Sequence, residues 1–247
     1  MKPKTLNCRG KYVLILGDMH IPFHQPGVFD WLKLIVKHYK LTPKNSVIMS
    51  IGDEVTLNTY SFHQRDPDIP YSPSSELQEC IDIIHQKGGL YEMFPKLFLC
   101  SSNHGDLIYR RAKWAQLPLH TIKSYAEILK VKGWQWHHDY MLKTDLGTVY
   151  VHHGRGKIGK VVSAMQSSAC AGHYHSEFGI WWYGSPSGDR FGAQVGSLCD
   201  QYSLDMEYGK LSTKRPLLGS LLLGMDGTPH LLKMPVDKNN KWTGKLQ

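Results

Sequence analysis

The stretch YVLILGDMH, residues 12–20, begins as a continuous apolar run and ends in a glycine, an aspartate and a histidine. A short apolar run that stops at Gly17 is typical of a strand buried on both faces, as in a parallel sheet. The runs SVIMSI (46–51) and LFLC (97–100) repeat this pattern, and apolar residues at helical spacing lie between 28 and 39. The first half of the chain therefore predicts parallel βαβ units.

Further elements follow from local patterns. Ser75 and Gln78 form a capping-box pattern that predicts the start of a helix. Residues 141–144 and 148–152 flank Asp145-Leu146-Gly147, a turn that predicts a hairpin. We also expect helices near 106–116, 121–130 and 158–167 and strands at 168–171, 177–183, 191–196, 217–223 and 229–234. We expect one domain over residues 1–236, followed by a polar C-terminal tail over residues 237–247.

The composition suits a packed protein outside membranes. Hydrophobic residues make up 41% of the 247 residues and charged residues 20%, which is ordinary for a globular chain. The longest apolar runs are far too short to span a bilayer, and residues 1–10 lack the apolar stretch of a secretory signal. The five cysteines are odd in number and form no CxxC pair. We therefore expect a protein of the reducing cytoplasm, without a membrane partner.

The charge balance is basic, with 29 lysines and arginines against 21 acids and a net charge of +8. A positive surface raises the rate of association with phosphates, so DNA or RNA is a candidate partner. No long basic run is present, and simple solubility explains the balance equally well.

Residues that can bind metals follow five of the predicted strands directly. In open α/β sheets ligands bind beyond the carboxyl ends of the strands, so these residues can converge there. Ligands at i and i+2 of an extended segment point the same way, which suits Asp-x-His and His-x-His. His152 and His153 compete for one position, because neighbouring residues of a strand face opposite ways. The candidate ligands are Asp18, His20, Asp53, Asn103, His152 or His153, His173 and His175.

The chemistry of this set is coherent. Carboxylates, an amide oxygen and imidazoles suit manganese, iron or zinc, with nickel also compatible, better than calcium or magnesium alone. Sulfur is absent from the set, which disfavours a closed structural zinc site. Asp18, Asp53 and Asn103 are also ordinary turn formers, but their joint placement after strands favours a metal site.

Five ordered motifs resemble those of the calcineurin-like metallophosphoesterase superfamily, which includes small phosphoesterases of phages and bacteria. The resemblance runs from residue 18 to residue 175. It implies an α/β fold, a four-layer α/β/β/α sandwich with mixed sheets, and two divalent metal ions at one edge. The motifs are Asp18-x-His20, Gly52-Asp53, Asn103-His104, His153-Gly154 and Gly172-His173-x-His175.

The resemblance also implies a role for each residue. Asp18, His20, Asp53 and His175 would hold one ion, most simply manganese, and Asp53 would bridge to the other. Asn103, His153 and His173 would complete the second site, since the family places the fourth-motif ligand directly before glycine. His104 would be the catalytic histidine that meets the phosphate and assists the leaving oxygen.

The chain departs from the family pattern at three places. Glu54-Val55-Thr56 stands where the second motif often continues with x-x-Asp, Gly105 separates the Asn-His pair from Asp106, and Ser102 replaces a glycine. The metal ligands are unaffected, while the orientation of His104 depends on the structure.

The activity that the resemblance implies is phosphate-ester hydrolysis by a hydroxide that bridges two metals. The basic charge, and the absence of the Asp-Arg-Gly of protein phosphatases, favour phosphodiesters or nucleic acid, as in a phosphodiesterase or nuclease. The alternatives are a small-molecule phosphomonoesterase and a non-catalytic binding scaffold. Arg110 and Arg111 are candidate substrate-binding residues that could clamp a phosphate; alternatively, they belong to a helix face exposed to solvent.

Trp181 or Trp182 could stack on a base or could pack in the sheet.

Overall fold

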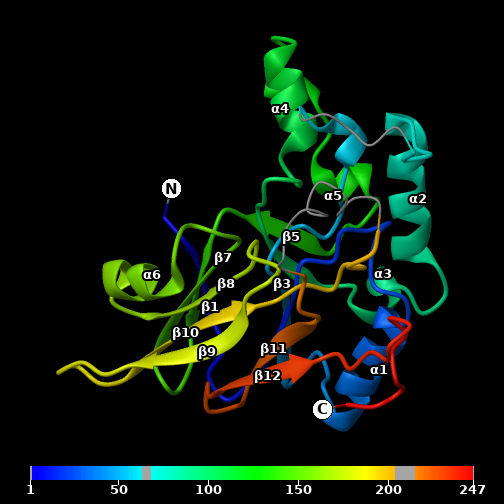
Figure 1. Ribbon diagram of the computed structural model, residues 1–247. Helices are drawn as coiled ribbons and strands as arrows, with labels where there is room; N and C mark the ends of the chain where they lie inside the picture. The colour runs from blue at the N-terminus through cyan, green and yellow to red at the C-terminus, as the bar shows by residue number, and fades with distance from the viewer. Residues whose placement is uncertain (1, 63–67, 204–214, 247) are drawn as a thin grey trace.

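The computed structural model describes residues 2–62, 68–203 and 215–246, which form two six-stranded mixed sheets (Figure 1). Sheet A has the strand order β1 (Lys4–Asn7), β6 (Tyr140–Lys143), β7 (Thr148–His152), β8 (Ser168–Ala171), β10 (Arg190–Val195) and β9 (Phe178–Tyr183). Sheet B has the order β12 (Pro229–Lys233), β11 (Gly219–Leu223), β2 (Tyr12–Leu16), β3 (Ser46–Ser50), β4 (Leu97–Cys100) and β5 (Trp134–His137).

Both sheets contain runs of parallel strands next to antiparallel pairs, which join β2 to β11 and β7 to β6. In sheet B, β2 to β5 all run parallel, with Leu14 of β2 opposite Ile48 of β3. This arrangement confirms the predicted βαβ units. In sheet A, β7 and β8 are parallel, with Val151 opposite Cys170. The carboxyl ends of β2, β3 and β4 therefore share one sheet edge, and those of β7 and β8 share another.

Alternating residues of β2 face two different cores. Val13 and Ile15 belong to a core between the two sheets, which also contains Val149 and Val151 of β7. The intervening Leu14 and Leu16 pack with helices on the outer face of sheet B. A continuous apolar run is what such a strand needs, because both of its faces are buried.

The helices form the outer layers. Those that contribute to the core on sheet B are α1 (Val28–His38), α2 (Pro73–His85), α3 (Leu90–Met93), α4 (Leu107–Trp114) and α5 (Tyr125–Ile128), and α4 projects beyond the sheets (Figure 1). Short 3-10 turns cover Asn58–Tyr60 and Leu119–Thr121. On sheet A, α6 (Ile158–Met165) packs through Val161 and Val162 on Ala169 and Ala171 of β8. The chain thus has the four-layer α/β/β/α architecture predicted from its sequence.

Some local predictions were wrong. Helix α2 begins at Pro73 with Ser72 as its cap, and the capping box joins Ser72 to Ser75 rather than Ser75 to Gln78. Proline suits the first position of a helix because its missing N–H would have no partner there. The helix predicted over 121–130 is reduced to the single turn α5, and β1 and β5 were not predicted.

The segment after Val236 packs on the rest of the molecule. The Gln25 side-chain amide donates to the Asn240 carbonyl over 2.6 Å, and the Asn240 amide donates to Asp200 over 2.8 Å. Trp242 contacts the core beneath α1. The polar tail is therefore anchored through Asn240, and the domain boundary between residues 236 and 237 stays a prediction.

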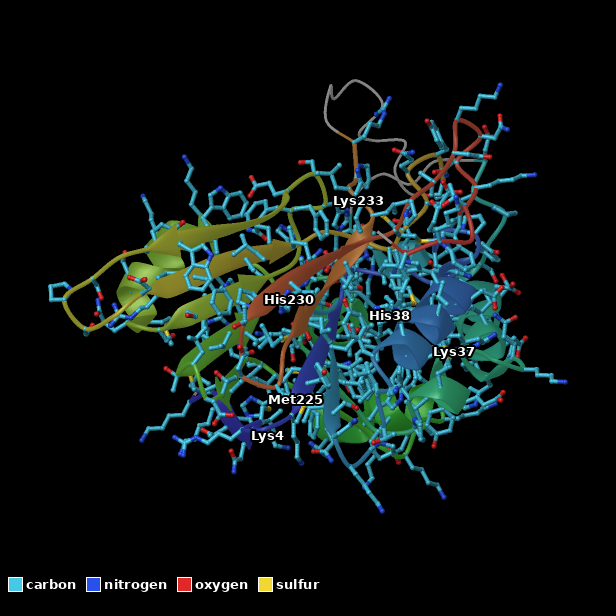
Figure 2. All side chains as sticks on the ribbon, turned by 90° about the horizontal axis from the view of Figure 1, so that it is seen from below. Lys4, Lys37, His38, Met225, His230 and Lys233 are labelled. Atoms are coloured by element: carbon cyan, nitrogen blue, oxygen red, sulfur yellow. The ribbon has the colours of Figure 1, made fainter. Side chains whose placement is uncertain are left out.

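The structure also bears on two expectations from the sequence, the lack of a membrane-spanning helix and the lack of disulfides. Among the described residues, we find no helix with the length and apolar character needed to cross a bilayer. All five cysteines are buried free thiols. Figure 2 shows the labelled Lys4, Lys37 and Lys233 on three separate elements, β1, α1 and β12.

Candidate metal centre

The predicted ligands meet where the two sheet edges face each other. Short main-chain hydrogen bonds tie the ligand-bearing loops together. The N–H groups of Met19 and His20 donate to the Asp53 carbonyl over 3.0 and 2.8 Å, and that of Gly172 donates to the His153 carbonyl over 2.7 Å. The loops after β2 and β3 are therefore tied to each other, and so are those after β7 and β8.

The first group of donors consists of Asp18, His20, Asp53 and His175, whose ligand atoms all lie within 4.8 Å of one another. His175 Nε2 lies 3.0 Å from Asp18 Oδ2 and 3.2 Å from His20 Nε2. His20 Nε2 lies 3.6 Å from Asp53 Oδ2. These four side chains present two carboxylates and two imidazoles to one small volume.

The second group consists of Asp53, His153 and His173, which also place ligand atoms within 4.8 Å of one another. His153 Nε2 lies 3.1 Å from Asp53 Oδ2 and 2.8 Å from Asn103 Oδ1, so the amide oxygen joins this group. Asp53 belongs to both groups. The structure thus brings together the side chains of all seven residues expected as ligands from the sequence, in two groups that share Asp53.

The buried histidines are oriented to use their Nε2 atoms. His20 Nδ1 lies 3.1 Å from the Thr56 hydroxyl, which itself donates to the His20 carbonyl over 3.2 Å. Because that hydroxyl proton is already donated, the hydroxyl accepts a hydrogen bond from His20 Nδ1–H, and Nε2 is the atom that faces His175 and Asp53. His153 Nδ1 lies 3.2 Å from the Ile51 carbonyl, which can only accept, so Nδ1 carries a proton and Nε2 is the atom directed at Asp53 and Asn103. Such outer partners fix the tautomer of metal-binding histidines.

The residues fit two bound cations. Asp18 is fully buried, and its Oδ1 has no hydrogen-bond partner among the described residues. A buried carboxylate oxygen without a partner is costly, and a cation removes that cost. The facing Nε2 atoms of His20 and His175 likewise need a shared proton or a metal ion between them. The donor set is the mixed O/N type that transition metals prefer.

The same crowding perturbs the ionisation of the ligands. Burial raises the pKa of the Asp53 carboxyl, but the imidazoles of His153, His104 and His20 outweigh burial and hold this pKa well below its ordinary value. Burial lowers the pKa of His153, yet the Asp53 and Asp18 carboxylates raise it to about 9. The site therefore carries concentrated negative charge that a cation would neutralise.

Strained backbone marks three of the ligands. His20, Asp53 and His173 have φ values of 52°, 48° and 69°, in the left-handed region that side chains rarely adopt. Strain of this kind persists where function requires it. A Cβ on Gly172 would lie 2.5 Å from Asp18 Oδ1, and a Cβ on Gly52, whose φ is 117°, would lie 2.7 Å from His153 Nδ1. Glycine is required at both positions for the ligands to approach.

His104 lies beside this centre. Its main-chain N–H donates to Asp53 Oδ1 over 3.2 Å, and its Nδ1 donates to the Thr56 carbonyl over 2.6 Å. The His104 and His20 rings are in edge contact, 4.7 Å between centroids. The departures from the family pattern have therefore left His104 next to the centre, with its Nε2 available for proton transfer.

Two residues that hold the centre were not singled out as functional from the sequence. Thr56 contacts both His20 and His104, and the Ser102 hydroxyl accepts from the Asp53 and Gly105 N–H groups over 3.0 and 3.1 Å. Both stand at the departures noted in the sequence. The departures from the family pattern at these two positions were the available signal in the sequence, because a residue that replaces a motif residue can take over a local contact.

The other candidate side chains contact residues outside the two donor groups. His152 faces away from the centre, stacked on Tyr150 at 5.1 Å between ring centroids. The Arg111 guanidinium donates to the carbonyls of Tyr60 and Ser61 and lies 4.0 Å from the Phe62 ring centre. Arg110 lies 5.3 Å from the same ring. Both arginines thus border the segment that follows the second motif.

A cavity of about 300 Å³ opens directly on the second group of ligands. Its lining includes Asn103, His153 and His173 together with Arg155 and His138. Arg155 is held by a 3.1 Å ion pair with the buried carboxylate of Asp139. A substrate that enters this cavity would meet the proposed ligands and a fixed guanidinium together.

We compared the chain with protein families, curated sequences and solved structures. No protein-family profile and no curated protein sequence matches the chain. Among solved structures it is similar to Chaetomium thermophilum Vps29, at 12% identity over 96% of each chain and a TM-score of 0.46. An archaeal phosphodiesterase is 11% identical over 90% of this chain and 99% of its own, with a TM-score of 0.47. A putative diadenosine tetraphosphatase is 12% identical over 98% and 100%, with a TM-score of 0.44. At these identities and TM-scores we draw neither a family nor an activity from them.

Proposed function

We propose that this chain is a calcineurin-like metallophosphoesterase, a hydrolase that binds two divalent metal ions and cleaves phosphate esters. The observation that carries the proposal is the convergence of the seven predicted donors into two groups that share Asp53. Ordinary turn residues from five separate strand ends have no reason to place their ligand atoms in one volume. Three proposed ligands with a strained backbone support the same assignment, as does the buried Asp18 Oδ1, which has no hydrogen-bond partner among the described residues.

Each group would hold one ion. Asp18, His20, Asp53 and His175 would bind the first, and Asp53, Asn103, His153 and His173 the second, with manganese favoured by the mixed donors and iron, zinc or nickel compatible. When bound, a pair of such ions supplies Lewis acidity toward phosphoryl oxygens and activates water near neutral pH. The protein's part is to hold the donors rigidly through Thr56, Ser102 and the shared loop hydrogen bonds.

His104 would move the proton. The Thr56 carbonyl holds one proton on Nδ1, so the second proton of the imidazolium form would be on Nε2, which would pass it to the departing oxygen and become neutral. The hydrogen bond from the His104 N–H to Asp53 would hold this imidazole beside a phosphate bound at the metal centre. We assign His104 as the general acid.

We propose phosphodiesters, including DNA or RNA, as the substrates. The net charge of +8 supports this choice, and Arg110, Arg111 and Arg155 are the cations we propose for binding phosphate. Five unpaired buried thiols support a reducing compartment, the cytoplasm.

The test compares ester classes on manganese-loaded protein. We expect kcat/KM for bis-p-nitrophenyl phosphate to exceed that for p-nitrophenyl phosphate, and binding to single-stranded DNA or RNA to weaken as salt rises. Asp53→Asn is the matched inactive control. A reversed ester preference without salt-sensitive binding would indicate a small-molecule phosphomonoesterase. Two bound metals without turnover of any ester would indicate a non-catalytic scaffold.

A further inference from the structure

A second cavity, of about 280 Å³, lies among α4, α5 and β5 and is walled by aromatic rings. Tyr109 of α4 and Tyr125 of α5 are in edge contact at 5.2 Å between ring centroids. Tyr125 lies 5.9 Å from Trp136, which lies 6.0 Å from Trp134, both on β5. The four rings form a continuous aromatic wall.

This aromatic cavity adjoins the reaction site. Ser101 and Asp106 line both it and the cavity that opens on the metal ligands, so the two lie on either side of the segment 101–106. Gly105, which follows His104, is part of its wall. The Trp136 indole N–H donates to Glu54 Oε1 over 2.9 Å, and Glu54 follows Asp53. Trp136, which lines the aromatic cavity, thus contacts the residue that follows Asp53 in the chain.

The chemistry of the cavity selects an uncharged, flat group with polar edges. No lysine or arginine of the described chain lines it, and Asp106 contributes a carboxylate, so a second phosphate is disfavoured there. By distance and angle, the buried Tyr125 hydroxyl has no hydrogen-bond partner among the described residues, and Ser101 adds another hydroxyl at the boundary between the cavities. A cavity of this size is just below the range for whole small ligands, so it fits part of a larger one.

We propose that the aromatic cavity binds the nucleobase of a nucleotide phosphodiester whose phosphate lies at the metal centre. The inference rests on the proposed function and names the substrate class of that site. Aromatic side chains stack on any base through its π-face, so the cavity would select nucleotides over other phosphodiesters without selecting a sequence.

The kinetic test compares two diesters with the same leaving group, thymidine 5′-(p-nitrophenyl phosphate) and methyl p-nitrophenyl phosphate. We expect the parent protein to prefer the nucleotide ester in kcat/KM by about 5- to 100-fold, the range that one base–aromatic stack supplies. Tyr109→Leu removes the stacking face of a half-buried ring, and Ala126→Leu fills the cavity from α5. Both should reduce the preference at least about fivefold. Trp182→Leu removes an exposed ring, 53% accessible, on β9 and should leave the preference unchanged.

A binding test separates the cavity from the chemistry. Thymidine, which carries no phosphate, should bind metal-free parent protein in equilibrium dialysis and should bind Tyr109→Leu and Ala126→Leu more weakly. If the parent binds thymidine in this way but hydrolyses neither ester, the cavity assignment stands and the proposed function fails. If both esters are hydrolysed equally and thymidine does not bind, the proposed function stands and the cavity assignment is wrong. A preference that depends on Trp182 instead would place the base on β9 and would also overturn it.

Discussion

Replacing Thr56 by valine removes the hydroxyl that orients His20 but keeps the shape of the residue 56 side chain. Thr56 is fully buried, and its hydroxyl is 3.1 Å from His20 Nδ1. In Thr56→Val the Nδ1–H has no acceptor there, and an unsatisfied buried donor costs about 1–3 kcal/mol. At 1.36 kcal/mol per factor of ten, this corresponds to about 5- to 150-fold in affinity, and outer partners of metal ligands typically contribute 10- to 100-fold.

We therefore expect Thr56→Val to bind manganese about 10- to 100-fold more weakly at the site that contains His20. Titration against a competing chelator measures this affinity. Thr56→Ser keeps the hydroxyl and should bind as the parent does. The contact of His104 with residue 56 uses a main-chain carbonyl, so it survives both changes. Parent-like affinity of both ions in Thr56→Val would refute the assignment of His20 as a ligand oriented through Thr56.

Three further predictions follow from individual contacts. His104→Ala should retain both metals and lose about 10²- to 10⁴-fold in kcat, with a smaller loss for a p-nitrophenolate than for a nucleoside leaving group; equal losses on both, by steady-state kinetics, would indicate phosphate binding instead. Gly52→Ala puts a Cβ 2.7 Å from His153 Nδ1 at a φ of 117°, so denaturant titration should show a loss of about 1–3 kcal/mol, and elemental analysis a loss of metal. A variant with parent stability and metal content would contradict the close approach of these loops. Burial raises the pKa of the Cys80 thiol far above its ordinary 9.0, so above pH 9 only the unfolded chain releases this proton. The free energy of unfolding should then fall as pH rises, and Cys80→Ala should reduce that slope by up to about 1.4 kcal/mol per pH unit; an unchanged slope would mean that the thiol is not protected in the folded state.

The strands of the parallel core were predictable because burial on both faces leaves a direct mark on the sequence. Runs such as YVLIL need no tertiary information to be recognised, and the polar residues that follow them mark the sheet edge. β1 and β5 lack that mark. β1 alternates between half-buried and exposed positions at a sheet edge, and β5 carries glutamine and histidine beside its tryptophans.

The convergence of the proposed ligands was also predictable, because each of these residues belongs to a short local motif at the end of a strand. The residues that orient them were not. Thr56 lies 36 positions from His20, and Ser102 lies 49 positions from Asp53, so these hydrogen bonds exist only once β2, β3 and β4 are adjacent. The aromatic cavity has the same origin, since Tyr109, Tyr125 and Trp136 come from three elements. Only WQW, within β5, was visible as a local cluster.

The measurement that tests the central claim most directly is the metal content of the manganese-loaded chain after removal of free ions. We predict two ions per chain for the parent and the loss of both sites' tight binding in Asp53→Asn, because Asp53 alone belongs to both donor groups. His152→Gln, at a buried histidine outside those groups, should keep both ions. One ion or none in the parent, or two ions retained in Asp53→Asn, would contradict the dinuclear centre.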